Sequence, residues 1–161
     1  MKILLFSDSH GNTSNMLKAI KKNKGVSMVI HLGDCVRDIL KVREIHGELD
    51  YRFVSGNNDW SREYPTEQLL KVEGKRLFIT HGHHYNVKQD YQRIAARGRA
   101  ASADAVFFGH THKAEEFFSD GMLVLNPGSI GTPPGFYGSN PIYCLVELYE
   151  DRIIPRFAGI G

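Results

Sequence analysis

The first 55 residues alternate between short apolar segments and amphipathic segments, and this alternation constrains the fold more than any other feature. Segments 2–6, 27–32 and 51–55 have the length and apolar content of buried strands. Between them, segments 13–23 and 35–46 carry apolar side chains at helical spacing. Strands alternating with helices over short connections predict a parallel sheet with helices on its faces.

The rest of the chain is richer in strands. With 161 residues it is long enough for one compact core and too short for two ordinary domains. Asp120–Gly121, inside 115–127, is the sequence of a type I′ hairpin turn. We predict a single domain over 1–161, with two packed sheets and helices outside, and the pattern leaves the strand order open. The other predicted elements are strands at 68–72, 76–80, 103–108, 142–149 and 153–159, and a helix at 86–101.

Composition and charge narrow the class of protein. No apolar run approaches the roughly 18 residues that cross a membrane, and the apolar run at the N-terminus is too short for a secretory signal. We therefore predict a cytoplasmic protein. The net charge of +2 comes from 20 basic and 18 acidic residues along the whole chain, which gives no argument for an obligatory nucleic-acid partner. Cys35 and Cys144 form no CxxC pair and are expected to be structural thiols. The sequence leaves open whether the protein forms a homo-oligomer.

Five predicted strands are followed directly by side chains that can bind metal ions, usually beside a glycine. The carboxyl ends of strands in an open α/β sheet form the crevice where ligands bind, so we expect these side chains to meet. Carboxylate, imidazole and amide oxygen, without cysteine, suit Mn, Fe, Zn or Ni. Seven ligands exceed one four-coordinate ion and suit two ions sharing a carboxylate. The candidates are Asp8, His10, Asp34, Asn57, His81, His110 and His112.

Spacing suggests how these side chains converge. In extended backbone, residues i and i+2 project to one side, so Asp8 and His10 are expected to reach one point, as are His110 and His112. Asp34 is the expected bridge between two ions, because it follows a strand expected to be central. Each motif alone also fits turn chemistry or a surface cluster. Their joint position at five strand ends favours a ligand site.

These ordered motifs resemble those of the calcineurin-like metallophosphoesterases, and within them the small single-domain phosphodiesterases of the YfcE type. The resemblance implies an α/β fold, an αββα four-layer sandwich of two mixed β-sheets flanked by helices, with a dinuclear metal centre that often holds manganese. NPGS at 126–129 also resembles that subgroup. The motifs that carry the resemblance are DSH at 8–10, GD at 33–34, GNND at 56–59, THGH at 80–83 and GHTH at 109–112.

Carried over residue by residue, the resemblance implies a ligand set for each ion, with Asp34 between the two ions. We expect manganese first, with zinc, iron, nickel or magnesium as alternatives. Asn58 departs from the family pattern, because many relatives carry a histidine there that is thought to assist the leaving group. An amide is no efficient proton donor near neutral pH. The implied ligands are Asp8, His10 and His112 for one ion, and Asn57, His81 and His110 for the other.

The predicted activity is the hydrolysis of small phosphodiesters by a metal-bridging hydroxide at a dinuclear site. Asn57 and His110 are expected near the phosphate. His83 is expected to contact the substrate or protonate the leaving oxygen, or else to orient His81. No arginine lies in the motifs to clamp a doubly charged monoester, which favours diesters. The alternative is a non-catalytic metal-binding scaffold or protein-interaction module, like a relative of this fold in the retromer coat, but all seven ligands are retained here.

Several residues outside the ligand set can be explained by structure alone, and some of them also have a functional alternative. The Gly- and Pro-rich segment 127–141 is either a rim over the site or a plain connector. Within it, Phe136 and Tyr137 either stack on a base or an aryl ester, or cover the core or a subunit contact. Asp38 is expected on the solvated face of its helix, with contact to a metal ligand as the alternative. His31, His46 and His84 are assigned to structure.

Overall fold

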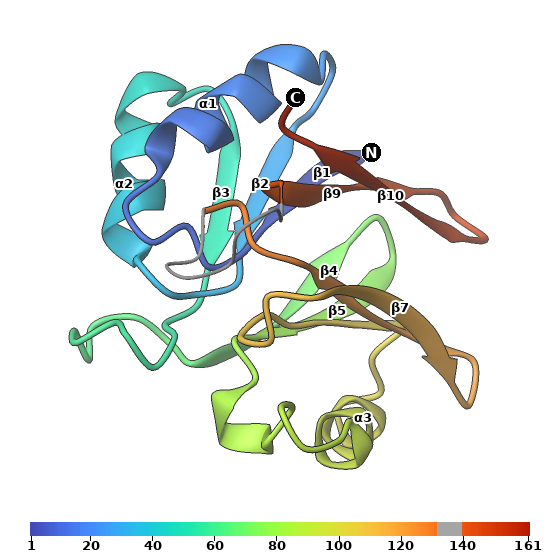
Figure 1. Cartoon of the computed structure of the whole chain (residues 1–161). Coiled ribbons are helices and arrows are strands. Elements are labelled where there is room, and N and C mark those ends of the chain that lie inside the picture. Colours follow the sequence, from blue (N-terminus) through green and yellow to red (C-terminus); the bar gives the residue numbers. More distant parts are fainter. Residues whose placement is uncertain (132–139) are drawn as a thin grey trace.

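The computed structural model describes residues 1–131 and 140–161, and these form two five-stranded mixed sheets (Figure 1). The first sheet has the order β10 (Ile153–Gly159), β9 (Ile142–Leu148), β1 (Lys2–Phe6), β2 (Met28–His31) and β3 (Asp50–Phe53). The second has the order β4 (Glu67–Val72), β5 (Lys75–Thr80), β6 (Ala105–Phe107), β8 (Met122–Pro127) and β7 (Ala114–Ser119).

Three adjacent strands of each sheet are parallel, which brings their carboxyl ends to one edge. In the first sheet β1, β2 and β3 are parallel, as the alternation predicts, whereas β9 runs antiparallel to β1. Phe6 pairs with His31, and His31 with Phe53, so these three strands end level with one another. In the second sheet β5, β6 and β8 are parallel, and Ile79 pairs with Phe107 near the ends of β5 and β6. β1, rather than β2, is the central strand of its sheet.

The helices cover the outer faces of the two sheets. Figure 1 shows α1 (Thr13–Lys22) and α2 (Val36–Ile45) against the first sheet and α3 (Gln92–Ala100) against the second. Along β1, Ile3 and Leu5 belong to the core between the sheets, and Leu4 and Phe6 to the core under α1 and α2. Both faces of β1 are therefore buried, which explains its continuous apolar run. The predicted αββα sandwich is confirmed.

Local differences from the predicted elements have identifiable causes. The helix predicted over 86–101 begins only at Gln92, because a 3₁₀ turn, η1 (His83–Tyr85), precedes it and Asn86 has a left-handed φ of 51°. Asp120 and Gly121 both have positive φ, as a type I′ turn requires. Phe136 and Tyr137 lie outside the described residues. Within the described ranges, no helix combines the length and the apolar character needed to cross a bilayer.

Candidate metal centre

The predicted ligands lie where the carboxyl ends of strands from both sheets face one another. Asp8, Asp34 and His81 are buried there, whereas His10 and His112 are half-buried. Asp8 and Asp34 follow β1 and β2 of the first sheet, and His81 follows β5 of the second. The packing of one sheet on the other therefore assembles the cluster.

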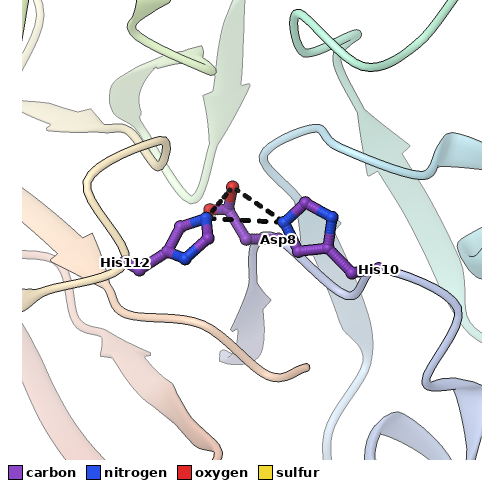
Figure 2. A group of neighbouring side chains, drawn as sticks. All are labelled: Asp8, His10 and His112. Carbon is purple, nitrogen blue, oxygen red and sulfur yellow. Dashed lines mark hydrogen bonds and ion pairs between the residues drawn. The ribbon is translucent and has the colours of Figure 1, made fainter. Parts of the chain in front are cut away.

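Asp8, His10 and His112 form the first group that could hold a metal ion. One ligand atom from each lies within 4.8 Å of the others. Nε2 of His112 lies 3.1 Å from Oδ1 of Asp8 and 3.4 Å from Nε2 of His10. Figure 2 shows the two imidazoles pointing toward each other beside the carboxylate of Asp8. Because His10 and His112 are 102 positions apart in sequence, only the tertiary fold brings them together.

Asp8, Asp34 and His81 form the second group, which shares Asp8 with the first. Nε2 of His81 lies 3.4 Å from Oδ1 of Asp34 and 3.9 Å from Oδ1 of Asp8. The side-chain oxygen of Asn57 lies 3.1 Å from the same nitrogen. His110 belongs to neither group, although its ring centroid is 5.0 Å from that of His81.

Both carboxylates lie between the imidazoles of the two groups, but they present different atoms. Asp34 directs Oδ1 toward His81, and its Oδ2 lies 3.9 Å from Nε2 of His10. Oδ2 of Asp8 accepts hydrogen bonds from the Ser7 hydroxyl and from the backbone N–H of His110. Only Oδ1 of Asp8 faces the histidines, so Asp34 alone offers one oxygen to each group.

The donor set of the cluster fits a cation. Nδ1 of His81 lies 2.7 Å from the carbonyl oxygen of Leu32, so Nδ1 carries a hydrogen and Nε2 is the ring nitrogen left to bind a metal ion. Nε2 faces oxygen atoms of Asp8, Asp34 and Asn57. Oδ1 of Asp8 is buried and has no hydrogen-bond partner among the described residues. Facing lone pairs and buried carboxylates fit divalent metal ions bound by oxygen and imidazole nitrogen.

Left-handed backbone positions the ligands, and the extended conformation assumed from their spacing is wrong. The positive φ angles are Asp8 54°, His10 45°, Asp34 60°, His110 70° and His112 61°. Such angles are unfavourable for residues with a Cβ, at about 1–3 kcal/mol each, and they cluster at functional sites. The side chains of Asp8 and His10 do converge, but tight turns bring them together. His112 belongs to the first group, whereas the ring of His110 lies beside that of His81.

Two glycines allow the strand-end loops to pack closely around the carboxylates. A Cβ at Gly56 would lie 2.1 Å from Oδ1 of Asp34. A Cβ at Gly109 would lie 1.9 Å from Oγ of Ser7, the hydroxyl that donates to Asp8. These contacts explain the glycine that precedes the polar residues after two of the strands.

Asn58 and Asp59 of the GNND motif hold Asp34 in place. The backbone N–H and side-chain amide of Asn58 donate to the two oxygens of Asp34, at 3.0 and 2.7 Å. The carboxylate of Asp59 accepts backbone hydrogen bonds from Asp34, Val36 and Gly56 at 2.8–2.9 Å. The sequence shows only that Asn58 replaces the histidine of many relatives. Its hydrogen bonds to the Asp34 carboxylate are seen only in the structure.

Asp38 does not lie on a solvated helix face, contrary to the expectation. It is buried and accepts hydrogen bonds from the hydroxyl of Ser9 at 2.8 Å and the backbone N–H of Gly11 at 2.7 Å. Nε2 of buried His31 lies 3.1 Å from the same hydroxyl. Asp38 precedes buried Val42 by four residues, so helical spacing already places it on the apolar stripe.

The pKa values reflect this environment. Burial opposes ionisation of Asp8, but the close approach of Nε2 of His112, at 3.1 Å, and the nearby charge of His81 lower its pKa to about 2. The same contact with Asp8 raises the pKa of His112. Burial and neighbouring histidines lower the pKa values of His83 and His110 to about 4. At neutral pH Asp8 is therefore ionised, and His83 and His110 are neutral.

His83 lies at the margin of the cluster, beside the second group. Its ring centroid is 5.4 Å from that of His81 and 6.1 Å from that of His110. Its ring also lies against that of exposed His84, with 3.9 Å between the ring centroids and an angle of 38° between the ring planes. Nδ1 of His83 is buried without a hydrogen-bond partner in the described part of the chain. Both expected roles, contact with a substrate and orientation of His81, are compatible with this position.

The αββα sandwich with carboxylates and imidazoles at facing strand ends defines a metallophosphoesterase. The model of the calcineurin-like phosphoesterase superfamily domain matches residues 1–151, and the chain belongs to this family. A probable metallophosphoesterase of Bacillus subtilis, YsnB, is 31% identical over 159 residues, covering 98% of this chain and 90% of the relative. A phosphodiesterase of Methanocaldococcus jannaschii is 31% identical over 146 residues, covering 80% and 83%.

Solved structures agree with the fold. A conserved protein of Streptococcus pneumoniae described as a predicted phosphoesterase superposes with a TM-score of 0.82 at 26% identity, covering 98% of this chain and 88% of that one. Wild-type Vps29 of Entamoeba histolytica in complex with zinc superposes with a TM-score of 0.79 at 19% identity, covering 99% of both chains. At 19% identity, the similarity to Vps29 concerns the fold alone.

Proposed function

We propose that this chain is a phosphodiesterase that hydrolyses small phosphodiesters with two divalent metal ions. One observation carries the proposal: Asp34 presents one oxygen to His81 and the other to His10, between two groups of metal-binding side chains. The likeness to the phosphodiesterase of Methanocaldococcus jannaschii supports the class of substrate. The proposed ligands are Asp8, His10 and His112 for one ion, Asn57, His81 and His110 for the other, and Asp34 for both.

When bound, the two ions would lower the pKa of water and neutralise the phosphoryl oxygens. Asp8, with a pKa of about 2, supplies negative charge to hold them at neutral pH. The carbonyl of Leu32 fixes the His81 ring with Nε2 toward the centre. Neutral His110 can donate an N–H to the phosphate, and exposed Asn57, whose side-chain oxygen lies 3.1 Å from Nε2 of His81, is a second polar contact.

Neither His83 nor Asn58 is a strong proton donor for the leaving group. His83 is neutral at pH 7 because its pKa is about 4, so we propose that it contacts the substrate rather than supplies a proton. The side-chain amide of Asn58 is engaged by Asp34. Esters of acidic alcohols and phenols, whose leaving groups need no proton, are therefore the preferred substrates.

Diesters are favoured over monoesters by the charges at the centre. In the described part of the chain, no hydrogen bond or ion pair of Asp8 or Asp34 involves an arginine. A doubly charged monoester usually gains from a bidentate arginine, whereas the single charge of a diester depends less on one.

Hydrolysis of bis-p-nitrophenyl phosphate by the manganese-loaded protein tests the proposal. We expect activity that Asp34→Asn and His110→Ala each reduce at least about 100-fold, since they remove the shared carboxylate and a phosphate contact. Asp120→Asn and His46→Ala, which change a hairpin turn and the end of α2, should retain activity. Parallel loading with zinc, iron, nickel and magnesium ranks the metals.

The second candidate is a metal-binding scaffold, favoured by the likeness in fold to Vps29. Two experimental outcomes distinguish an enzyme from a scaffold and test the assigned residues. If the metal-loaded wild type hydrolyses neither diesters nor monoesters, the enzyme proposal is wrong and the scaffold is favoured. If it hydrolyses diesters and both site variants match it, the enzyme stands but the residue assignment is wrong.

A further inference from the structure

The single tryptophan of the chain, Trp60, directly follows the GNND motif and is 96% exposed. It lies in the loop between β3 and β4. A large indole in water makes no contribution to the core, and aromatic side chains in that position commonly provide contact surface for a ligand. Exposure alone does not identify the ligand, so the surroundings of Trp60 decide the argument.

Trp60 lines a surface cavity of about 360 Å³. Tyr64, on the same wall, packs edge-on against Phe53 at 5.2 Å between ring centroids, which holds that wall in place. Arg37 is the basic residue of the lining, and Asp59 and Glu63 are acidic, so the lining carries no excess of positive charge. Such a lining favours an uncharged ring over a second anion. The other lining residues include Cys35, Val36, Leu40 and Asn58.

Asn58 separates this cavity from the metal centre and touches both. It lines the cavity, while its side-chain amide donates to Oδ2 of Asp34 at 2.7 Å. A phosphoester at the centre would therefore have one ester arm within reach of Trp60. A larger cavity of about 710 Å³ lies beside α1 and the end of α2, and none of its lining residues belongs to the centre.

We propose that Trp60 determines substrate specificity by stacking on a planar aromatic ring in one ester arm of the substrate. This inference rests on the proposed phosphodiesterase function and narrows its substrates to diesters with an aryl or nucleobase group. The cavity beside Asn58 holds the ring, and the adjoining metal centre holds the phosphate. Trp60 is a specificity residue and takes no part in bond breaking.

Trp60 is also the reporter that tests the inference, because tryptophan fluorescence arises from this residue alone. We would load the protein with zinc and titrate adenosine 5′-monophosphate against ribose 5-phosphate, and phenylphosphonate against methylphosphonate. The ringed member of a pair should quench the fluorescence and bind about ten-fold more tightly, as expected for a base on an aromatic ring. The two pairs distinguish a nucleobase from an aryl group.

Calorimetric titrations of variants complete the test. Trp60→Ala should abolish the preference for the ringed ligand, and Trp60→Phe should retain most of it. Phe118→Ala removes another exposed aromatic residue, on β7, and should keep the full preference. Equal affinities within both pairs in the wild type, or a preference that survives Trp60→Ala, would overturn the inference. It is also overturned if sedimentation shows that Trp60→Ala converts an oligomer into a monomer.

Failure of this inference can be told apart from failure of the proposed function. Hydrolysis of bis-p-nitrophenyl phosphate by the manganese-loaded protein reports the function, whereas ring-dependent affinity reports the cavity. A protein that hydrolyses diesters without any ring preference contradicts only the role of Trp60. A protein that hydrolyses no ester contradicts the function, and with it the assignment of Trp60 to substrate.

Discussion

Truncation of Asp38 should loosen the loop that carries His10, although Asp38 is no proposed ligand. Oδ2 of Asp38 accepts hydrogen bonds from the Ser9 hydroxyl and the Gly11 backbone N–H, the neighbours of His10 on either side. Asp38→Ala removes both bonds, whereas Asp38→Asn keeps an oxygen that can accept them. The two variants therefore separate the hydrogen bonds from the charge.

The expected magnitudes follow from these contacts. A hydrogen bond to a charged acceptor contributes about 1.5–3 kcal/mol, so two bonds set an upper limit of roughly 3–6 kcal/mol. The Ser9 hydroxyl has another acceptor 3.4 Å away, the Asp34 carbonyl oxygen, and water reaches exposed Gly11. We therefore expect Asp38→Ala to lower the free energy of unfolding by about 3 kcal/mol, and Asp38→Asn by about 1 kcal/mol.

Metal affinity should follow the same order. Loss of a residue that supports a metal ligand typically weakens metal binding by about 10–100-fold, which is the change expected for Asp38→Ala. Urea denaturation of the metal-free protein and calorimetric titration with manganese measure the two effects. Glu44→Ala, which removes an exposed acid from the same helix, is the matched control and should change neither. Unchanged manganese affinity in a folded Asp38→Ala variant would refute the argument.

Three further predictions concern packing, pH and metal. Gly109→Ala should destabilise the protein by about 1–3 kcal/mol and weaken manganese binding, because the new Cβ would lie 1.9 Å from Oγ of Ser7; Gly47→Ala, with its nearest such contact at 3.5 Å, should do neither in the same assays. Burial lowers the pKa of His31 from 6.5 to about 4, so the unfolded chain takes up a proton before the native protein does as the pH falls. The free energy of unfolding should therefore drop by about 3 kcal/mol between pH 6.5 and 4, and urea titrations should show a smaller drop for His31→Gln. Chelation by EDTA should lower the melting temperature, and added manganese should restore it; a melting temperature that does not depend on metal would count against the site.

Local features of the sequence were sufficient to predict most of the elements. The apolar run 2–6, the helical spacing in 13–23 and the Asp120–Gly121 turn all depend on neighbouring residues, and the structure has each of them. The parallel strands follow as well, because alternation of strands and helices allows few arrangements. The metal-binding side chains at five strand ends could also be predicted, because they directly follow the apolar segments in the sequence.

Other features depended on contacts between distant segments, so no local pattern could reveal them. The backbone at Asp8 and His10 is left-handed because turns, rather than an extended strand, carry the ligands. The helix at 92–100 begins late because Asn86 turns the chain. The support given by Asn58 to Asp34 spans 24 positions, and a sequence pattern contains no record of such a pair.

The sequence by itself determined which side chains stand at the ends of strands, since that depends on periodicity and on the residues that stop each strand. Only the tertiary structure decided which of them face one another. His10 meets His112, and His81 meets Asp34, because the two sheets pack through a shared apolar core that brings their strand ends together. The tertiary structure also decides that Trp60 is exposed and Asp38 is buried, since burial depends on the assembled layers and not on a residue's place in the chain.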